Sequence, residues 1–275
     1  MLYQAAFLRG DRETMERQLT WAAGRSGEED WLLSTQSDTE AYFGRLRQAR
    51  KFSERAVVSA QDGEAKETAA LWQANAALRE AEFGDPALAR QDVTAVLTLA
   101  SGSEVESVAA LALARAGDEV RTKKLADSLE QDFPKNTIVQ RYWLPAIHSA
   151  IAMHENHPAQ AEQVLQISAP YELRQCEPFQ LGMMYPIYLR GQAYLLGRQG
   201  KEAAVEFQKI IDHRGIMLNF PLGALAHLQL GRAYALQGDT TKARGAYQDF
   251  LTLWKDADPN IPLLKQAKVE YANLQ

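Results

Sequence analysis

Residues 225–254 read LAHLQLGRAYALQGDTTKARGAYQDFLTLW, and the spacing of residue types in this stretch recurs along the chain. The pattern predicts one helix up to residue 237 and a second helix that runs to about Trp254. Between them, Gly238 suits the left-handed residue that ends a helix, because glycine has no Cβ to clash. Asp239 can then accept a hydrogen bond from the free N–H groups of the next helix. The stretch therefore predicts two helices joined by a tight turn.

Small residues predict that these two helices pack closely. Gly231 in the first helix faces Ala243 in the second, and Tyr247 and Phe250 fill the space beside them. Small residues at these offsets, with large ones between, are the pattern of tetratricopeptide (TPR) repeats. The stretch resembles that family at Leu230, Gly231, Tyr234, Ala243 and Tyr247, and an earlier unit resembles it at Gly191, Tyr194, Ala203 and Phe207. That earlier unit carries Arg190 where the family has leucine.

A turn signature recurs at seven places along the chain. Four of them carry a Gly-Asp step, and the others carry glycine, asparagine or arginine at the equivalent place. The seven positions are Gly10, Gly44, Gly84, Gly117, Asn156, Arg198 and Gly238, at intervals of 34, 40, 33, 39, 42 and 40 residues. The TPR period is about 34 residues. We therefore predict an all-α fold, a TPR-like right-handed superhelical α-solenoid of about seven helix pairs with a C-terminal capping helix.

The pattern predicts one solenoid domain over residues 1–275. Its first repeat is predicted to be truncated, because residues 3–9 supply only the end of a first helix. Two stretches, 168–184 and 213–224, interrupt the pattern and are expected to be inter-repeat loops. Residues 263–274 are expected to form the capping helix.

Prolines mark two irregularities. Pro145 lies inside a helix expected over residues 137–155, so a kink or a late start is predicted there. Residues 213–221 are interpreted as a connector whose Phe220 and Pro221 pack on the next helix. The alternative that this loop or 168–184 is functional stays open.

Composition limits the classes of partner. The chain is 46% hydrophobic and 24% charged, with a net charge of −5. No basic run is present, so we expect no nucleic-acid binding through phosphate neutralisation. No stretch of about 18 apolar residues is present, so we expect no membrane span and no direct membrane contact in this sequence. Neither a compartment nor an oligomeric state is indicated.

Candidate catalytic and metal-binding residues are few. The stretch from His154 to His157 reads HENH, one residue short of the spacing that places two histidines on one face of a helix. Cys176 is the single cysteine, in an expected loop without a basic cluster to lower the pKa of its thiol. An enzyme centred on Cys176 and a histidine is therefore the least favoured hypothesis. We expect no catalytic residue, no metal and no cofactor.

The first helices of successive TPR pairs line a concave face. By the family offsets, the candidate binding residues on that face are Asn75, Trp143, Tyr185, Tyr188, Gln192, Leu225, Leu228 and Arg232. Aromatic rings with a few polar groups suit an extended peptide or a helix, because rings give a large contact area at low entropy cost. We therefore predict a protein or peptide partner in the concave groove. The alternative is that Tyr185 and Tyr188 only cover the core, or that the C-terminal helix fills the groove.

Longer stretches resemble a more particular family. They are ERQLTWAAGRSGEEDWLLSTQSDTEAYFGRLRQAR from residue 16, KETAALWQANAALREAEFG from residue 66, and the stretch from residue 212 to residue 274 that begins DHRGIMLNFPLGALAHLQLG. The chain resembles, over essentially its whole length, the C-terminal repeat region of bacterial (acidobacterial-type) eukaryote-like serine/threonine protein kinases.

That resemblance implies a longer protein with an N-terminal kinase domain and a membrane span that would tether it to the bacterial inner membrane. Kinase motifs are absent from this sequence, so no catalytic residue carries over and the chain itself is not expected to be an enzyme. The resemblance implies that this chain is a non-catalytic protein-interaction and scaffolding module, the sensor or recruitment region of a larger bacterial serine/threonine kinase. The alternative is a ligand- or peptide-sensing repeat domain of a winged-helix transcription regulator, because similar arrays are attached to such proteins.

Overall fold

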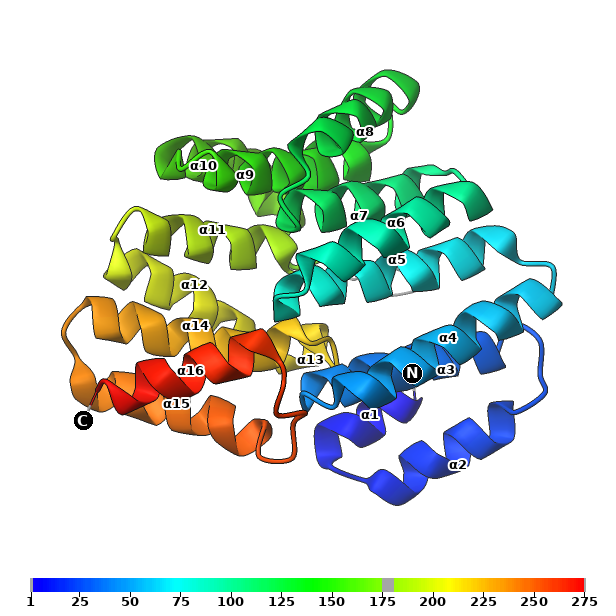
Figure 1. Cartoon of the computed structure of the whole chain (residues 1–275), viewed down its shortest axis with the longest axis horizontal. Coiled ribbons are helices and arrows are strands. Elements are labelled where there is room, and N and C mark those ends of the chain that lie inside the picture. Colours follow the sequence, from blue (N-terminus) through cyan, green and yellow to red (C-terminus); the bar gives the residue numbers. More distant parts are fainter. Residues whose placement is uncertain (1, 175–180, 275) are drawn as a thin grey trace.

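The computed structural model describes residues 2–174 and 181–274. These residues form helices and short connections, and no strand occurs among them (Figure 1). The α-helices are α1 (Leu2–Arg9), α2 (Arg12–Ala22), α3 (Glu29–Tyr42), α4 (Leu46–Asp62), α5 (Lys66–Phe83), α6 (Pro86–Leu99), α7 (Ser103–Arg115), α8 (Glu119–Asp132), α9 (Leu144–His154), α10 (Pro158–Leu165), α11 (Tyr185–Leu196), α12 (Gly200–Asp212), α13 (Arg214–Met217), α14 (Leu222–Leu236), α15 (Thr240–Leu253) and α16 (Pro262–Ala272). The predicted all-α class is confirmed.

Consecutive helices pack in pairs, and each pair packs on the next. The pairs are α1–α2, α3–α4, α5–α6, α7–α8, α9–α10, α11–α12 and α14–α15. The second helix of a pair also contacts the first helix of the following pair, as α4 does with α5 and α12 with α14. No helix in the described ranges combines the length and the apolar character needed to cross a bilayer.

The seven predicted turn positions share one backbone geometry. All have a positive φ, including the non-glycine residues Asn156 (60°) and Arg198 (59°). At each turn, the N–H of the next residue donates to the carbonyl five residues before it, as from Asp239 to Tyr234 at 3.0 Å. This 6→1 bond is the Schellman closure of a helix end. In the four Gly-Asp steps the aspartate side chain also caps the following helix, at Asp11, Asp85, Asp118 and Asp239. The predicted turns are therefore confirmed in their hydrogen bonding.

Glycines inside helices allow the close packing that the sequence predicts. A Cβ on Gly231 would lie 2.8 Å from the ring of Tyr247, and one on Gly191 would lie 2.7 Å from the ring of Phe207. Ala243 has no exposed surface. In α11–α12 and α14–α15, an aromatic ring of the second helix therefore rests directly on the backbone of the first.

Pro145 produces the expected late start. A π-helix, η1 (Val139–Trp143), occupies the beginning of the predicted segment, and α9 begins at Leu144 with the proline in its first turn. A proline has no N–H, and its ring conflicts with the carbonyl four residues earlier in an α-helix. The wider π turn that precedes Pro145 removes this conflict.

The two predicted loops are partly helical, which corrects the sequence-based boundaries. A 3-10 helix, η2 (Gln166–Tyr171), extends into 168–184, and α13 together with the first turn of α14 lies within 213–224. Short helices of four to six residues have too little periodicity to stand out in a sequence. Phe220 and Pro221 are buried, as the connector interpretation predicts.

The last pair lies beside the second one, although the sequence gives no sign of it (Figure 1). The indole N–H of Trp254 donates to the carbonyl of Tyr42 at 3.0 Å, across 212 residues of sequence. Asp258 accepts hydrogen bonds from the backbone N–H and the guanidinium of Arg47, at 2.7 and 2.8 Å. Its own N–H donates to the carbonyl of Gly44 at 3.0 Å. The series of pairs thus turns back on itself, and α15 is joined to the α3–α4 turn.

Candidate binding surfaces

Most of the predicted concave-face residues are interior residues. Asn75, Trp143, Tyr185, Tyr188, Leu225 and Leu228 are at most 5% exposed, and Gln192 and Arg232 are half-buried. The structure places them on α5, α11 and α14, which are first helices of their pairs, and on η1, which leads directly into the first helix α9. Connecting segments cover part of this face, because Gly182 lies against the ring of Trp143 and Phe220 packs on Tyr185. A partner could contact the buried six only after the array had opened.

Tyr185 and Tyr188 pack inside this core. Their rings are 6.4 Å apart, and the ring of Tyr185 lies 6.1 Å from that of Phe220. The hydroxyl of Tyr188 accepts a hydrogen bond from the side-chain amide of Gln229 at 3.1 Å. Burial raises the pKa of both phenols, so they stay neutral at physiological pH. Both tyrosines therefore fill the interior, as the core alternative describes.

Arg232 is engaged by the C-terminal helix. Its guanidinium donates two hydrogen bonds, of 2.9 and 3.0 Å, to the carboxylate of Glu270 on α16. The hydroxyl of Tyr247 donates to the same carboxylate at 2.9 Å. A bidentate pair of this kind fixes the orientation of both partners. α16 therefore occupies the one cationic group that the sequence assigned to the concave face.

A buried polar cluster links the second and third pairs. Asp38 accepts hydrogen bonds from the amide of Asn75 at 3.0 Å and from the guanidinium of Arg79 at 3.1 Å. Arg79 also donates to the hydroxyl of Ser53 at 2.7 Å. Burial raises the pKa of Asp38 to about 6, although Arg79 and Asn75 act in the opposite direction. These partners are internal, so the cluster serves the fold.

The raised pKa of Asp38 predicts a pH dependence of stability. In the unfolded chain this carboxyl has a pKa of about 3.9, so the folded state binds its proton more tightly. The resulting stabilisation is full below about pH 4 and is lost as the pH rises through about 6. The free energy of unfolding, measured with urea between pH 4 and 7, is expected to fall less steeply with pH in Asp38→Asn than in the original chain. Burial also raises the pKa of Asp92 to about 6. The variant Asp92→Asn is therefore expected to reduce the pH dependence of stability in the same direction. If the free energy of unfolding of Asp38→Asn falls with pH as steeply as that of the original chain, the raised pKa of Asp38 is wrong.

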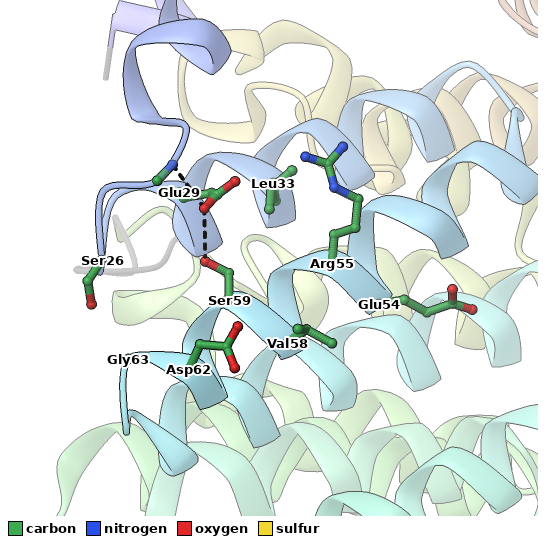
Figure 2. Close-up of a pocket in the computed structure, with 10 residues that line it drawn as sticks. Ser26, Glu29, Leu33, Glu54, Arg55, Val58, Ser59, Asp62 and Gly63 are labelled. Atoms are coloured by element: carbon green, nitrogen blue, oxygen red, sulfur yellow. Dashed lines mark hydrogen bonds between the residues drawn. The ribbon is translucent and has the colours of Figure 1, made fainter.

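An open hollow of about 650 Å³ lies between the α2–α3 connection and α4 (Figure 2). Three carboxylates, of Glu29, Glu54 and Asp62, line it together with the guanidinium of Arg55, so the lining is net negative. Val58 adds an apolar surface that is 54% exposed. We call this region the acidic hollow.

The acidic hollow is bordered by the connection between the first two pairs. The connection from α2 to α3 passes through Gly24 and Gly27, both with positive φ. It is held by the carboxylate of Glu29, which accepts from the N–H of Gly24 at 3.1 Å. On the far side, Gly63 lies so close to Ser26 that a Cβ would meet its hydroxyl at 2.6 Å. The rim is therefore fixed at both ends while the space between stays open.

The histidine candidates lie apart from any cluster of metal ligands in the described residues. In the ranges 2–174 and 181–274, no three His, Cys, Asp or Glu side chains gather in a way that could hold a metal ion. The ring of His154 packs beside Gly117, and its Nε2 lies 3.4 Å from the carbonyl of Arg115. Cys176 lies outside the described residues.

The chain matches no model of a known protein family, and no curated protein sequence matches it. Its function is therefore inferred from the repeated helical pairs and from the surfaces described above.

Proposed function

We propose that this chain is a non-catalytic protein-interaction and scaffolding module, built as a TPR-like right-handed α-solenoid. The observation that carries the proposal is the repetition of one turn at seven places, each closed by the same 6→1 hydrogen bond and each joining a pair that packs on the next. Stacked pairs of this kind spread recognition over an extended surface.

The acidic hollow is the proposed place of contact. It is open, whereas the side chains of Tyr185 and Tyr188 are each only 1% exposed. Its carboxylates favour a basic side chain, and exposed Val58 favours an apolar neighbour of that side chain. We therefore propose as partner an extended protein segment that carries lysine or arginine beside an apolar residue.

The parent protein is proposed from the sequence resemblance. A bacterial serine/threonine kinase would use the module as its sensor or recruitment region, and a winged-helix transcription regulator would use it to sense a ligand or peptide. The coding sequence immediately upstream distinguishes the two, because kinase motifs and a winged helix are each recognisable there.

A peptide selection tests the acidic hollow. A library of displayed 12-residue peptides, selected against the immobilised chain, is expected to enrich sequences that place lysine or arginine next to apolar residues. Calorimetry with one enriched synthetic peptide is expected to show at least about tenfold weaker binding to the double variant Glu54→Lys, Asp62→Lys, because two attractive charges become repulsive.

The matched control is Glu202→Lys, Asp127→Lys, which makes the same change of net charge at exposed positions on α12 and α8. Binding to this control is expected to stay within about twofold of the original, since neither residue lines the hollow and both are exposed, so that salt and water screen their charges. Equal losses in both double variants, or enrichment of acidic peptides, would contradict the proposed contact.

A further inference from the structure

A second hollow, of about 440 Å³, opens where the last pairs meet the first ones. Its walls come from α12, α13, α14 and α15, with Tyr42 of α3 closing one side. Ile210 and Met217 are buried behind these walls, and the partly exposed side chains of Ile211, Leu218 and Leu253 supply the apolar lining. We call it the α13 pocket. Sites for small molecules are apolar concavities of roughly 300–1,000 Å³ with a few fixed polar groups, and this pocket has that size and composition.

An arginine, a histidine and an aspartate line the α13 pocket, one from each of three helices. They are Arg214 of α13, His227 of α14 and Asp249 of α15. The guanidinium of Arg214 makes a long hydrogen bond of 3.5 Å to the carbonyl of Leu8. Within the described residues it forms no ion pair, so its charge is available to a ligand. The side chain of Asp249 is 68% exposed and lies 3.9 Å from Nδ1 of His227, so water screens it.

The backbone beside the pocket is strained. Leu218 follows α13 and lines the pocket. Its backbone has φ 54° and ψ −128°, a combination that residues with a Cβ rarely adopt. Strain of this kind persists where the surroundings fix it, and it is concentrated at ligand sites. Gly223 also lines the pocket, and a Cβ there would lie 3.0 Å from both Met217 and Tyr42. Gly223 thus lets the backbone of α14 lie directly against Met217 and Tyr42.

We propose that the α13 pocket binds a medium-chain carboxylate, with its carboxylate on the guanidinium of Arg214 and its hydrocarbon chain against Ile211, Leu218 and Leu253. The imidazole of His227 lies on the same lining and supplies a hydrogen-bond donor beside the arginine. The walls supply the apolar contact, and the guanidinium gives the preference for an anion. Because Tyr42 and the carbonyl of Leu8 belong to the first two pairs, an occupied pocket also strengthens their contact with α12–α15.

Calorimetry with decanoate, kept below its micelle concentration, tests the site. Decanoate is expected to bind at micromolar to sub-millimolar concentration and to raise the melting temperature. Decanol, which has the same chain without the charge, is expected to bind at least about tenfold more weakly. Arg214→Gln should weaken decanoate at least about tenfold and leave decanol unchanged, because only the charge–charge contact is lost. Arg244→Gln, an exposed arginine on α15, is the matched control and should change neither.

Each other outcome counts against the proposal. Absence of decanoate binding at 1 mM, or equal affinities for decanoate and decanol, would overturn it, as would equal losses in the two arginine variants. The peptide acetyl-Ala-Ala-Leu carries the same carboxylate on a shorter apolar body, and tighter binding of this peptide would reassign the pocket to protein C-termini. The α13 pocket and the acidic hollow share no residue, so failure of either experiment leaves the other intact.

Discussion

Gly44→Ala is expected to lower the free energy of unfolding by roughly 2–5 kcal/mol. Two effects add at this position. Gly44 has φ 71°, a left-handed conformation that costs a residue with a Cβ about 1–2 kcal/mol. The new methyl group would also lie 2.5 Å from Cβ of Ala257 and 2.8 Å from the ring of Trp254, so the segment after α15 must move away. Urea unfolding followed by circular dichroism at the helix band measures the loss.

Gly238→Ala is the matched control for this contact. Gly238 occupies the equivalent turn of α14–α15 with φ 76°, and a Cβ there has no atom within 4 Å. Only the backbone cost of about 1–2 kcal/mol is expected. The difference between the two variants therefore measures how much the contact between Trp254 and the α3–α4 turn contributes. If both variants lose the same stability, the close approach of these segments is wrong.

Ala243→Glu is expected to destabilise the protein by about 2–4 kcal/mol. Ala243 lies on α15 and is fully buried. The two helices pack closely there, because a Cβ on Gly231 of α14 would lie only 2.8 Å from the ring of Tyr247 on α15. A glutamate there has to force α14 and α15 apart or leave its charge without water. Thermal unfolding by calorimetry is the measurement, and an unchanged melting temperature would refute the assigned helix interface.

Gly245→Glu introduces the same side chain two residues further along the same helix. A Cβ on Gly245 meets no atom within 4 Å, so the glutamate has room to reach solvent. Replacing a glycine in a helix interior with glutamate is expected to stabilise by up to about 1 kcal/mol. The two variants should therefore shift the melting temperature in opposite directions, which no general effect of added negative charge can produce.

The turns could be predicted from the sequence because their geometry is decided locally. A glycine that ends a helix and an aspartate that begins the next one act within a few residues of each other, and all four Gly-Asp steps have the expected cap. Asn156 and Arg198 lack the Gly-Asp step, and only their spacing predicts a turn there. Their positive φ shows that the period holds even where residue identity does not.

The candidate site could be predicted only in part, because burial depends on how the pairs curve. The repeat offsets place Tyr188 and Leu228 on first helices, but the sequence does not encode the angle between successive pairs in any short pattern. A small angle at each step decides whether these helices form an open groove or a closed interior. The contact of Trp254 with Gly44 is the result of that accumulated curvature, and the α13 pocket, which Tyr42 closes on one side, depends on it as well.

Arg190 shows how a long-range partner changes the meaning of a residue. Its charge departs from the leucine of the repeat family, and in the sequence it reads as a weak match. In the structure its guanidinium donates to Glu172 at 2.8 Å and to Glu206 at 2.6 Å, in a largely buried position. Glu172 follows η2, inside a stretch that the sequence assigns to a loop, so the pairing could not be anticipated.

The bond between α15 and the α3–α4 turn also determines how the fold comes apart. In a row of helical pairs that touch only their neighbours, the outermost pairs open at a small free-energy cost and unfolding spreads inward. Here the α14–α15 pair cannot detach without breaking the hydrogen bonds of Trp254 and Asp258 to the second pair. Opening at that position is therefore coupled to opening at α3–α4, and the protein gains a cooperativity that a simple row of repeats lacks.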